Sequence, residues 1–147
     1  MITLYPLAFD ADTVPVFDVI FIDGLHEHSQ VRKDALNSLD CIDENGWIAF
    51  HDFLPANYLE QHLPRLGNGW PWTGDCWKLA YELSQAKNIE FKIVEIDRGV
   101  GLMKKISNDY FVPDLSKDLI GFGPLGINSW ATNPSNPVDN IAFIIAG

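Results

Sequence analysis

Basic residues are scarce in this chain of 147 residues, and their scarcity excludes several classes of function. Ten lysines and arginines stand against twenty aspartates and glutamates, so the formal net charge is −10 at pH 7. A surface that binds duplex nucleic acid needs clustered lysine and arginine to displace counterions from the phosphates. Attraction to an anionic membrane surface needs the same residues. We therefore expect no nucleic-acid partner and no membrane partner.

Cysteines and long apolar runs are scarce as well. Cys41 and Cys76 are the only cysteines, and neither belongs to a Cys-x-x-Cys motif. No apolar run reaches the ~18 residues that a membrane-spanning helix needs. The first residues lack the basic segment and apolar segment of a secretion signal. We expect a cytoplasmic protein with two free thiols.

Apolar residues, in contrast, are abundant enough for a folded core. They make up 47% of the chain, which argues against a disordered protein, and the length suits one domain. The composition changes near residue 106, because proline, asparagine, glycine and serine dominate residues 113–137. We predict a domain over residues 1–106. Residues 107–147 are expected to be an extended tail that either wraps on the domain or is partly disordered.

Two apolar segments, residues 16–22 and 47–50, end abruptly in acidic and imidazole side chains. The polar residues that follow them are Asp23, His26, His51 and Asp52. Continuous apolar runs of this length are typical of parallel strands that are buried on both faces. Functional groups of an open α/β sheet collect beyond the carboxyl ends of its strands. We therefore expect these four side chains to lie together on one rim of a sheet.

The remaining elements follow from periodicity and turn residues. Ser29 is a candidate N-cap for a helix whose apolar stripe repeats at helical spacing and which Glu44-Asn45-Gly46 would end. Asp75 is a candidate N-cap for a second helix, which runs to about Ala86. The other expected elements are strands at 2–5 and 139–145, a short helix at 57–63, and an antiparallel strand pair at 90–97 and 101–106. This order predicts an α/β fold with two crossovers and a hairpin.

Four segments resemble, in the same order, segments of class I S-adenosylmethionine-dependent methyltransferases. They are Phe21-Ile-Asp-Gly-Leu-His26, His51-Asp52, Trp72-Thr-Gly-Asp-Cys-Trp-Lys78 and Asp97-Arg-Gly-Val-Gly101. The chain is most similar to the small-molecule O-methyltransferase-like family, over roughly residues 1–106. The family's glycine-rich cofactor loop and the acidic residue after its second strand have no counterpart here. The resemblance therefore implies the C-terminal part of such an enzyme, with an incomplete Rossmann-like sheet and a C-terminal antiparallel hairpin.

The resemblance also implies a set of site residues. It places cofactor contacts at Asp10 and Asp23, a divalent metal such as magnesium at Asp23, His51 and Asp52, and a general base at His26. In such enzymes S-adenosylmethionine methylates a hydroxyl of a small-molecule acceptor, while a metal and a base help to remove the hydroxyl proton. A histidine ligand would favour zinc, iron or manganese over magnesium.

Each assignment has a structural alternative. Asp23 can cap the following helix, and the histidines of the rim can be hydrogen-bonded residues without a catalytic role. Trp70, Trp72 and Trp77 can line an acceptor pocket or pack in the core. For the chain as a whole, the alternatives are an inactive α/β domain that binds no cofactor and a metal-dependent hydrolase.

The absence of the family's first strands has a consequence for assembly. It leaves the strand at residues 17–22 without a neighbour on one side, and a long apolar edge strand promotes association. We expect that edge to be covered either by the strand at 2–5 or by a second chain, which would make the protein a homodimer.

Overall fold

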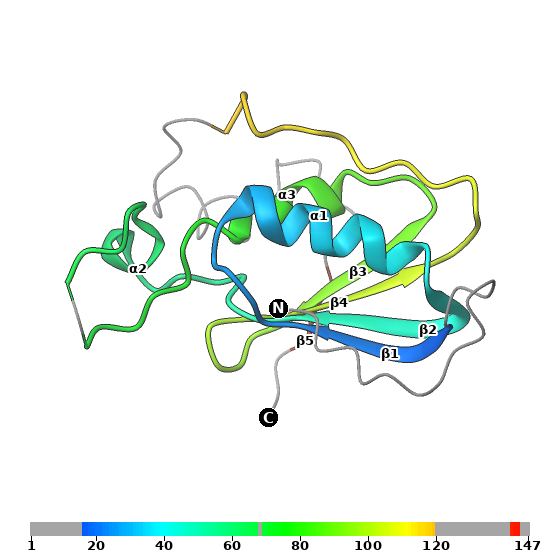
Figure 1. The fold of residues 1–147 in the computed structure, drawn as a ribbon, viewed down its shortest axis with the longest axis horizontal. Coiled ribbons are helices and arrows are strands. Elements are labelled where there is room, and N and C mark those ends of the chain that lie inside the picture. Colours follow the sequence, from blue (N-terminus) through cyan, green and yellow to red (C-terminus); the bar gives the residue numbers. More distant parts are fainter. Residues whose placement is uncertain (1–15, 68, 120–141, 145–147) are drawn as a thin grey trace, which may run out of the picture.

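The computed structural model describes residues 16–67, 69–119 and 142–144, and these residues form a mixed α/β structure (Figure 1). The elements are β1 (Phe17–Ile22), α1 (His28–Leu39), β2 (Ile42–Phe50), α2 (Tyr58–Gln61), α3 (Trp77–Ser84), β3 (Ile89–Val94), β4 (Val100–Lys105) and β5 (Ala142–Ile144). Within the described residues the strands form one sheet in the order β1-β2-β4-β3-β5. Helices α1 and α3 lie on the same face of that sheet, and α2 lies beyond one end of it.

The sheet combines parallel and antiparallel pairing, as the predicted fold class requires. Strands β1 and β2 are parallel and joined by α1, and β3 and β4 form an antiparallel hairpin. Strand β4 inserts between β2 and β3 and runs antiparallel to both, so β2 and β3 point in the same direction. The carboxyl ends of β1 and β2 and the turn between β3 and β4 therefore meet at one end of the sheet.

The core lies between the sheet and the two helices. The inward stripe predicted for α1 is buried at Val31, Ala35 and Leu39, and the stripe predicted for α3 is buried at Cys76, Leu79, Ala80 and Leu83. On the sheet, alternate residues face these helices; they include Ile20, Ile22, Ile48, Phe50, Phe91, Ile93 and Met103. This packing fixes the register of β1 against β2, and with it the positions of the residues that follow both strands.

Strand β1 corrects the prediction that both of its faces are buried. Val19 and Phe21 are 66% and 57% exposed, whereas Ile20 and Ile22 are buried. The physical reason is that α1 and α3 cover only one face of the sheet. Among the described residues, β1 is also an edge strand. The strand expected at residues 2–5 lies outside the described residues. That this strand or a second chain covers the edge of β1 therefore stays a prediction.

The start of α1 differs from the prediction as well. The helix begins at His28, and the cap is not Ser29, which lies inside the helix and is exposed. Instead the carboxylate of Asp75 accepts the His28 N–H at 2.6 Å from 47 residues away. Asp75 was expected to cap its own helix, but α3 begins two residues later with Cys76 at the N-cap position.

The prediction that the first helix ends at Glu44-Asn45-Gly46 is also wrong, because these residues belong to β2. The pairing with β1 slips there: Phe17 pairs with Ile42, and Val19 pairs with Trp47. The strand therefore accommodates the turn-forming residues as an irregularity instead of starting after them. A Cβ atom at Gly46 would lie 2.8 Å from the Asp18 carbonyl oxygen, so glycine permits this close approach.

Other predicted elements are present. The antiparallel pair appears as β3 and β4, the short helix as α2 with an Asn57 side-chain cap, and the last strand as β5.

The described residues after β4 pack against the domain. Val112 is in the core, and the Leu115 N–H donates to buried Glu82 at 2.9 Å. Within the described part of the chain, each helix is too short or too polar to cross a membrane.

Candidate functional site

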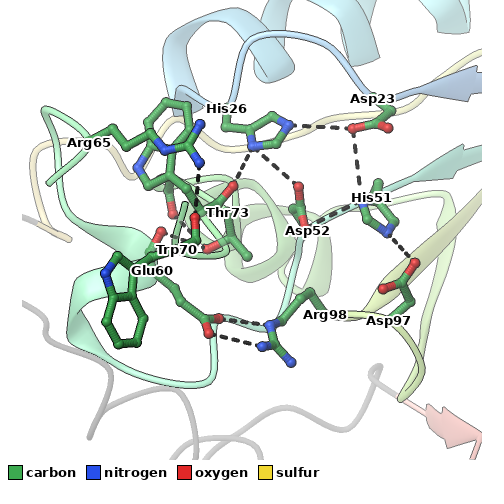
Figure 2. Close-up of polar contacts among 12 residues, drawn as sticks. Asp23, His26, His51, Asp52, Glu60, Arg65, Trp70, Thr73, Asp97 and Arg98 are labelled. Carbon is green, nitrogen blue, oxygen red and sulfur yellow. Dashed lines mark hydrogen bonds and ion pairs between the residues drawn. The ribbon is translucent and has the colours of Figure 1, made fainter. Parts of the chain in front are cut away.

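Four of the predicted site residues lie together at one end of the sheet, as Figure 2 shows. Asp23 and His26 follow β1, and His51 and Asp52 follow β2. The last residues of these strands, Ile22 and Phe50, are register partners, and the His51 N–H donates to the Ile22 carbonyl at 3.2 Å. The parallel pairing of the strands therefore brings Asp23 and His51 side by side. We call Asp23, His26, His51 and Asp52 the rim cluster.

Asp52 is the centre of the rim cluster. Its side chain is only 8% exposed, and its two carboxylate oxygens face different imidazoles: Oδ2 lies 3.2 Å from His26 Nδ1, and Oδ1 lies 3.3 Å from His51 Nδ1. Burial raises the pKa of Asp52, and the two histidines act in the opposite direction when they are charged. The backbone at Asp52 has a φ of 65°, a left-handed conformation that ends β2 and turns the side chain into the cluster.

His26 is held by contacts on both sides of its ring. Nδ1 lies 2.7 Å from the Trp72 carbonyl oxygen, and the ring stacks on Trp72 with centroids 5.3 Å apart and an interplanar angle of 24°. A carbonyl oxygen only accepts hydrogen bonds, so the proton of the neutral ring resides on Nδ1. Nε2 then carries the lone pair, and it faces Asp23 Oδ1 at 3.4 Å.

His51 lies between the rim cluster and the turn that joins β3 to β4. Nδ1 lies 3.8 Å from Asp23 Oδ1, and Nε2 lies 3.1 Å from Asp97 Oδ2 (Figure 2). Burial alone would lower the pKa of His51. The charge of Asp52, the hydrogen bond to Asp97 and the charge of Asp23 outweigh burial and raise the pKa above its ordinary value.

Three members of the rim cluster are close enough to share one metal ion. One ligand atom each of Asp23, His51 and Asp52 lies within 4.8 Å of the others. Two carboxylates and one imidazole make a donor set for a divalent cation. The imidazole nitrogen fits manganese, iron or zinc better than magnesium, which prefers an all-oxygen shell. Asp10, the other predicted cofactor contact, lies outside the described residues.

Two site features were not predicted from the sequence. Asp97 was noted as part of a turn but was not assigned to the site, although a carboxylate in a hairpin turn at the same end of the sheet could have suggested it. Glu60 is the other feature: it is only 5% exposed, its Oε2 forms an ion pair with Arg98 Nε at 2.9 Å, and its Oε1 accepts a hydrogen bond from Arg98 Nη2 at 3.0 Å. The Glu60 carbonyl also accepts the Thr73 N–H at 2.9 Å. Glu60 thereby links α2, the segment around Trp72 and the β3–β4 turn.

The three tryptophans named from the sequence have different environments. Trp77 is 2% exposed and packs with Leu119, so it belongs to the core. Trp72 stacks on His26 and thus lies at the site. Trp70 is 68% exposed on the segment that leads to Trp72, and its carbonyl accepts a hydrogen bond from Arg65 at 2.9 Å.

Comparison with known proteins supports a methyltransferase domain. Residues 6–53 match the family model of a methyltransferase domain. The match contains β1, α1 and β2 and includes every member of the rim cluster. A search of the curated proteins found no match to this chain. The site geometry and this match therefore point to the same segment of the protein.

Proposed function

We propose that this chain acts in S-adenosylmethionine-dependent O-methylation of a small-molecule hydroxyl, with the rim cluster as its catalytic centre. The observation that carries the proposal is the coincidence of two facts. The residues that match a methyltransferase domain end at Phe53, and the same residues bring two histidines and two aspartates together at the carboxyl ends of parallel strands. The family match supports the use of S-adenosylmethionine.

His26 has the geometry of a general base. The Trp72 carbonyl accepts the Nδ1–H of the neutral ring, which leaves the lone pair on Nε2, 3.4 Å from Asp23 Oδ1. The stacked Trp72 ring restricts rotation of the imidazole. In the proposed reaction, Nε2 takes the proton of the acceptor hydroxyl as its oxygen attacks the methyl carbon. When bound, S-adenosylmethionine would supply the methyl group, and its carbon–sulfur bond would break to leave S-adenosylhomocysteine, a neutral thioether.

Asp23, His51 and Asp52 would hold a divalent cation. When bound, such an ion lowers the pKa of a coordinated hydroxyl and makes it a better nucleophile. The residues of this chain fit the role because their ligand atoms converge within 4.8 Å, while Asp97 holds the far side of the His51 ring. Asp23 was predicted to contact the cofactor as well as the metal; its position beside both histidines supports the metal role.

A methyl-transfer assay tests the proposal. The purified chain is incubated with S-adenosylmethionine and Mn²⁺ together with phenols, sugars or lipid alcohols, and formation of S-adenosylhomocysteine is measured by mass spectrometry. His26→Asn is expected to lower the rate by about 100-fold or more, the usual contribution of a general base. His62→Asn is the matched control, since the half-buried His62 side chain lies outside the rim cluster and contacts the Pro64 carbonyl.

The assay separates the parts of the proposal. Product formation that survives unchanged in His26→Asn would reject His26 as the base. An absence of S-adenosylhomocysteine with every acceptor class would contradict O-methylation and would favour an inactive α/β domain.

A further inference from the structure

Asp97 is an exposed carboxylate that is distant from the rim cluster in sequence but contacts its His51 side chain. Its side chain is 83% exposed, yet its Oδ2 lies 3.1 Å from His51 Nε2. It belongs to the turn between β3 and β4, 46 residues beyond His51 and outside the segment that matches a methyltransferase domain. An exposed aspartate has no structural need for this partner, because water would solvate it equally well.

The contact determines which nitrogen of His51 is available. Both ring nitrogens of His51 face carboxylates, but the contact of Nε2 with Asp97 is the shorter, 3.1 Å against 3.3 Å for Nδ1 and Asp52, and it has hydrogen-bond geometry, so we assign the proton of the neutral ring to Nε2. In the neutral ring, Nδ1 then has a free lone pair. Nδ1 lies 3.3 Å from Asp52 Oδ1 and 3.8 Å from Asp23 Oδ1, so the lone pair is directed among carboxylate oxygens. Histidines that bind metals commonly donate their other ring N–H to a carboxylate in this way.

The turn that carries Asp97 is held in place against the end of β2. Asp97 and Arg98 both have positive φ values, 41° and 65°. The Arg98 carbonyl accepts the Leu54 N–H at 2.6 Å, and the Gly99 carbonyl accepts the Phe53 N–H at 3.1 Å. Because Phe53 follows directly after Asp52, these bonds fix the turn relative to the rim cluster. Two successive non-glycine residues persist in left-handed conformations only where surrounding contacts enforce them.

Arg98 adds a further anchor on the opposite side of the turn. Its Nε lies 2.9 Å from Glu60 Oε2, and its Nη2 donates to Glu60 Oε1 at 3.0 Å, so the pair is bidentate (Figure 2). Glu60 is buried in the short helix α2. A bidentate pair with a buried carboxylate restricts orientation more than a single exposed ion pair does. The Asp97 side chain is thereby presented to His51 by a rigid support.

We propose that Asp97 is a positioning residue that holds His51 with Nδ1 directed toward Asp23 and Asp52. The site therefore selects a divalent ion that binds nitrogen ligands, such as Mn²⁺, Co²⁺ or Zn²⁺, over Mg²⁺. This inference rests on the proposed metal site. It adds the residue that orients the nitrogen ligand and the class of ion that follows from it. Imidazole suits these transition metals, whereas Mg²⁺ prefers oxygen ligands and retains its water.

Metal titration of the full chain tests the inference without an acceptor. Calorimetry measures the binding of Mn²⁺ and of Mg²⁺ to the wild type and to Asp97→Ala, Asp97→Glu and Asp109→Ala. Asp109 is an exposed carboxylate beyond β4, near Asn88 at the other end of the hairpin, and so it controls for loss of one charge. Asp97→Ala is expected to weaken Mn²⁺ binding by about 10–100-fold, the usual effect of losing such an outer carboxylate.

Three further readouts distinguish positioning from folding and from charge. Asp97→Glu is expected to recover most of the Mn²⁺ affinity, and Asp109→Ala to leave it within twofold. Pulsed electron paramagnetic resonance of bound Mn²⁺ is expected to show coupling to an imidazole nitrogen in the wild type, which disappears in His51→Ala. Circular dichroism of each variant verifies that the fold is retained.

Two results would overturn the inference in different ways. If Mn²⁺ binds to the wild type, is lost in Asp23→Asn and is unchanged in Asp97→Ala, the metal site stands and Asp97 has no positioning role. If Mg²⁺ binds as tightly as Mn²⁺, or no imidazole coupling is seen, the selection of a nitrogen-accepting ion is wrong. If the wild type binds neither ion, both this inference and the proposed metal site fail.

Discussion

His26 contacts Trp72 twice, through the face of its ring and through its Nδ1 atom. The rings stack with centroids 5.3 Å apart, and Nδ1 lies 2.7 Å from the Trp72 carbonyl oxygen. The two residues are 46 positions apart, so the segment that carries Trp72 folds back over the rim cluster. This relationship gives His26 a defined ring orientation, which a general base needs.

The two histidines of the rim cluster are expected to adopt opposite neutral tautomers. The Trp72 carbonyl requires Nδ1–H at His26, and the Asp97 carboxylate requires Nε2–H at His51. Long-range ¹H–¹⁵N correlation spectra at high pH measure both tautomers directly. Trp72→Ala removes the ring stack but keeps the backbone carbonyl, so we expect both histidines to keep their tautomers in this variant. The same tautomer at both histidines of the wild type would contradict the hydrogen-bond assignment.

Replacement of Asp97 by asparagine is expected to lower the pKa of His51 in the metal-free protein. Burial lowers this pKa, but Asp52, Asp97 and Asp23 together raise it above the ordinary value, and the variant removes one of these carboxylates. Titration of the His51 ring signals by nuclear magnetic resonance, with a chelator present, measures the change. Asp109→Asn, which removes a distant carboxylate, is expected to leave the pKa of His51 as it is in the wild type.

The sign of the linked stability effect follows from the same pKa shift. Because the folded state raises the pKa of His51, folding favours the protonated ring. The stabilising contribution is present below the pKa of the unfolded chain and is lost as the pH rises through the folded pKa. The wild type should therefore lose more stability across this pH window than Asp97→Asn, as urea unfolding at a series of pH values would measure. An equal loss in both proteins would contradict the assigned cause.

The cap of α1 gives a test of the fold that is independent of function. Asp75 accepts the His28 N–H at 2.6 Å, whereas Ser29 is exposed within the helix. Asp75→Ala is expected to lower the free energy of unfolding by about 1 kcal/mol, the usual value of an N-cap. Ser29→Ala should change it by less than about 0.5 kcal/mol, as is usual for surface positions. Denaturant unfolding of both variants measures the difference, and a larger cost at Ser29 would refute the assignment.

The edge of β1 provides a prediction about assembly. Val19 and Phe21 are 66% and 57% exposed on one face of a strand that is an edge among the described residues. We expect the protein to associate as a homodimer through this edge, because exposed apolar edge strands pair with one another. Analytical ultracentrifugation should find a dimer in the wild type and a monomer in Val19→Lys. A wild type that remains monomeric at high concentration would contradict the prediction.

Local sequence patterns were sufficient for the elements with strong periodicity. The stripes of α1 and α3 and the strands around the Asp97–Gly101 turn were predicted because their apolar spacing and turn residues act within a few positions. The convergence of Asp23, His26, His51 and Asp52 was also predictable, since the ends of parallel strands meet at one edge of a sheet. Their roles in catalysis and metal binding stay predictions.

Contacts between distant residues were not predictable in this way. Asp75 caps a helix 47 residues before it, and Asp97 binds a histidine 46 residues before it. Residues close to either helix or histidine do not reveal these partners, because each pairing arises only when distant segments of the chain pack together. The exposure of Val19 and Phe21 was missed for a related reason: an apolar run does not reveal whether one or both faces of a strand are covered.

The central claim is that the rim cluster serves a methyltransferase that uses S-adenosylmethionine, and calorimetric titration with S-adenosylhomocysteine tests it most directly. The titration is run on the purified chain with Mn²⁺, with Mg²⁺ and with a chelator. The account predicts binding in the micromolar range, about 8 kcal/mol, to the wild type. An absence of binding under all three conditions would contradict the account and would identify this chain as an α/β domain that does not bind the cofactor by itself.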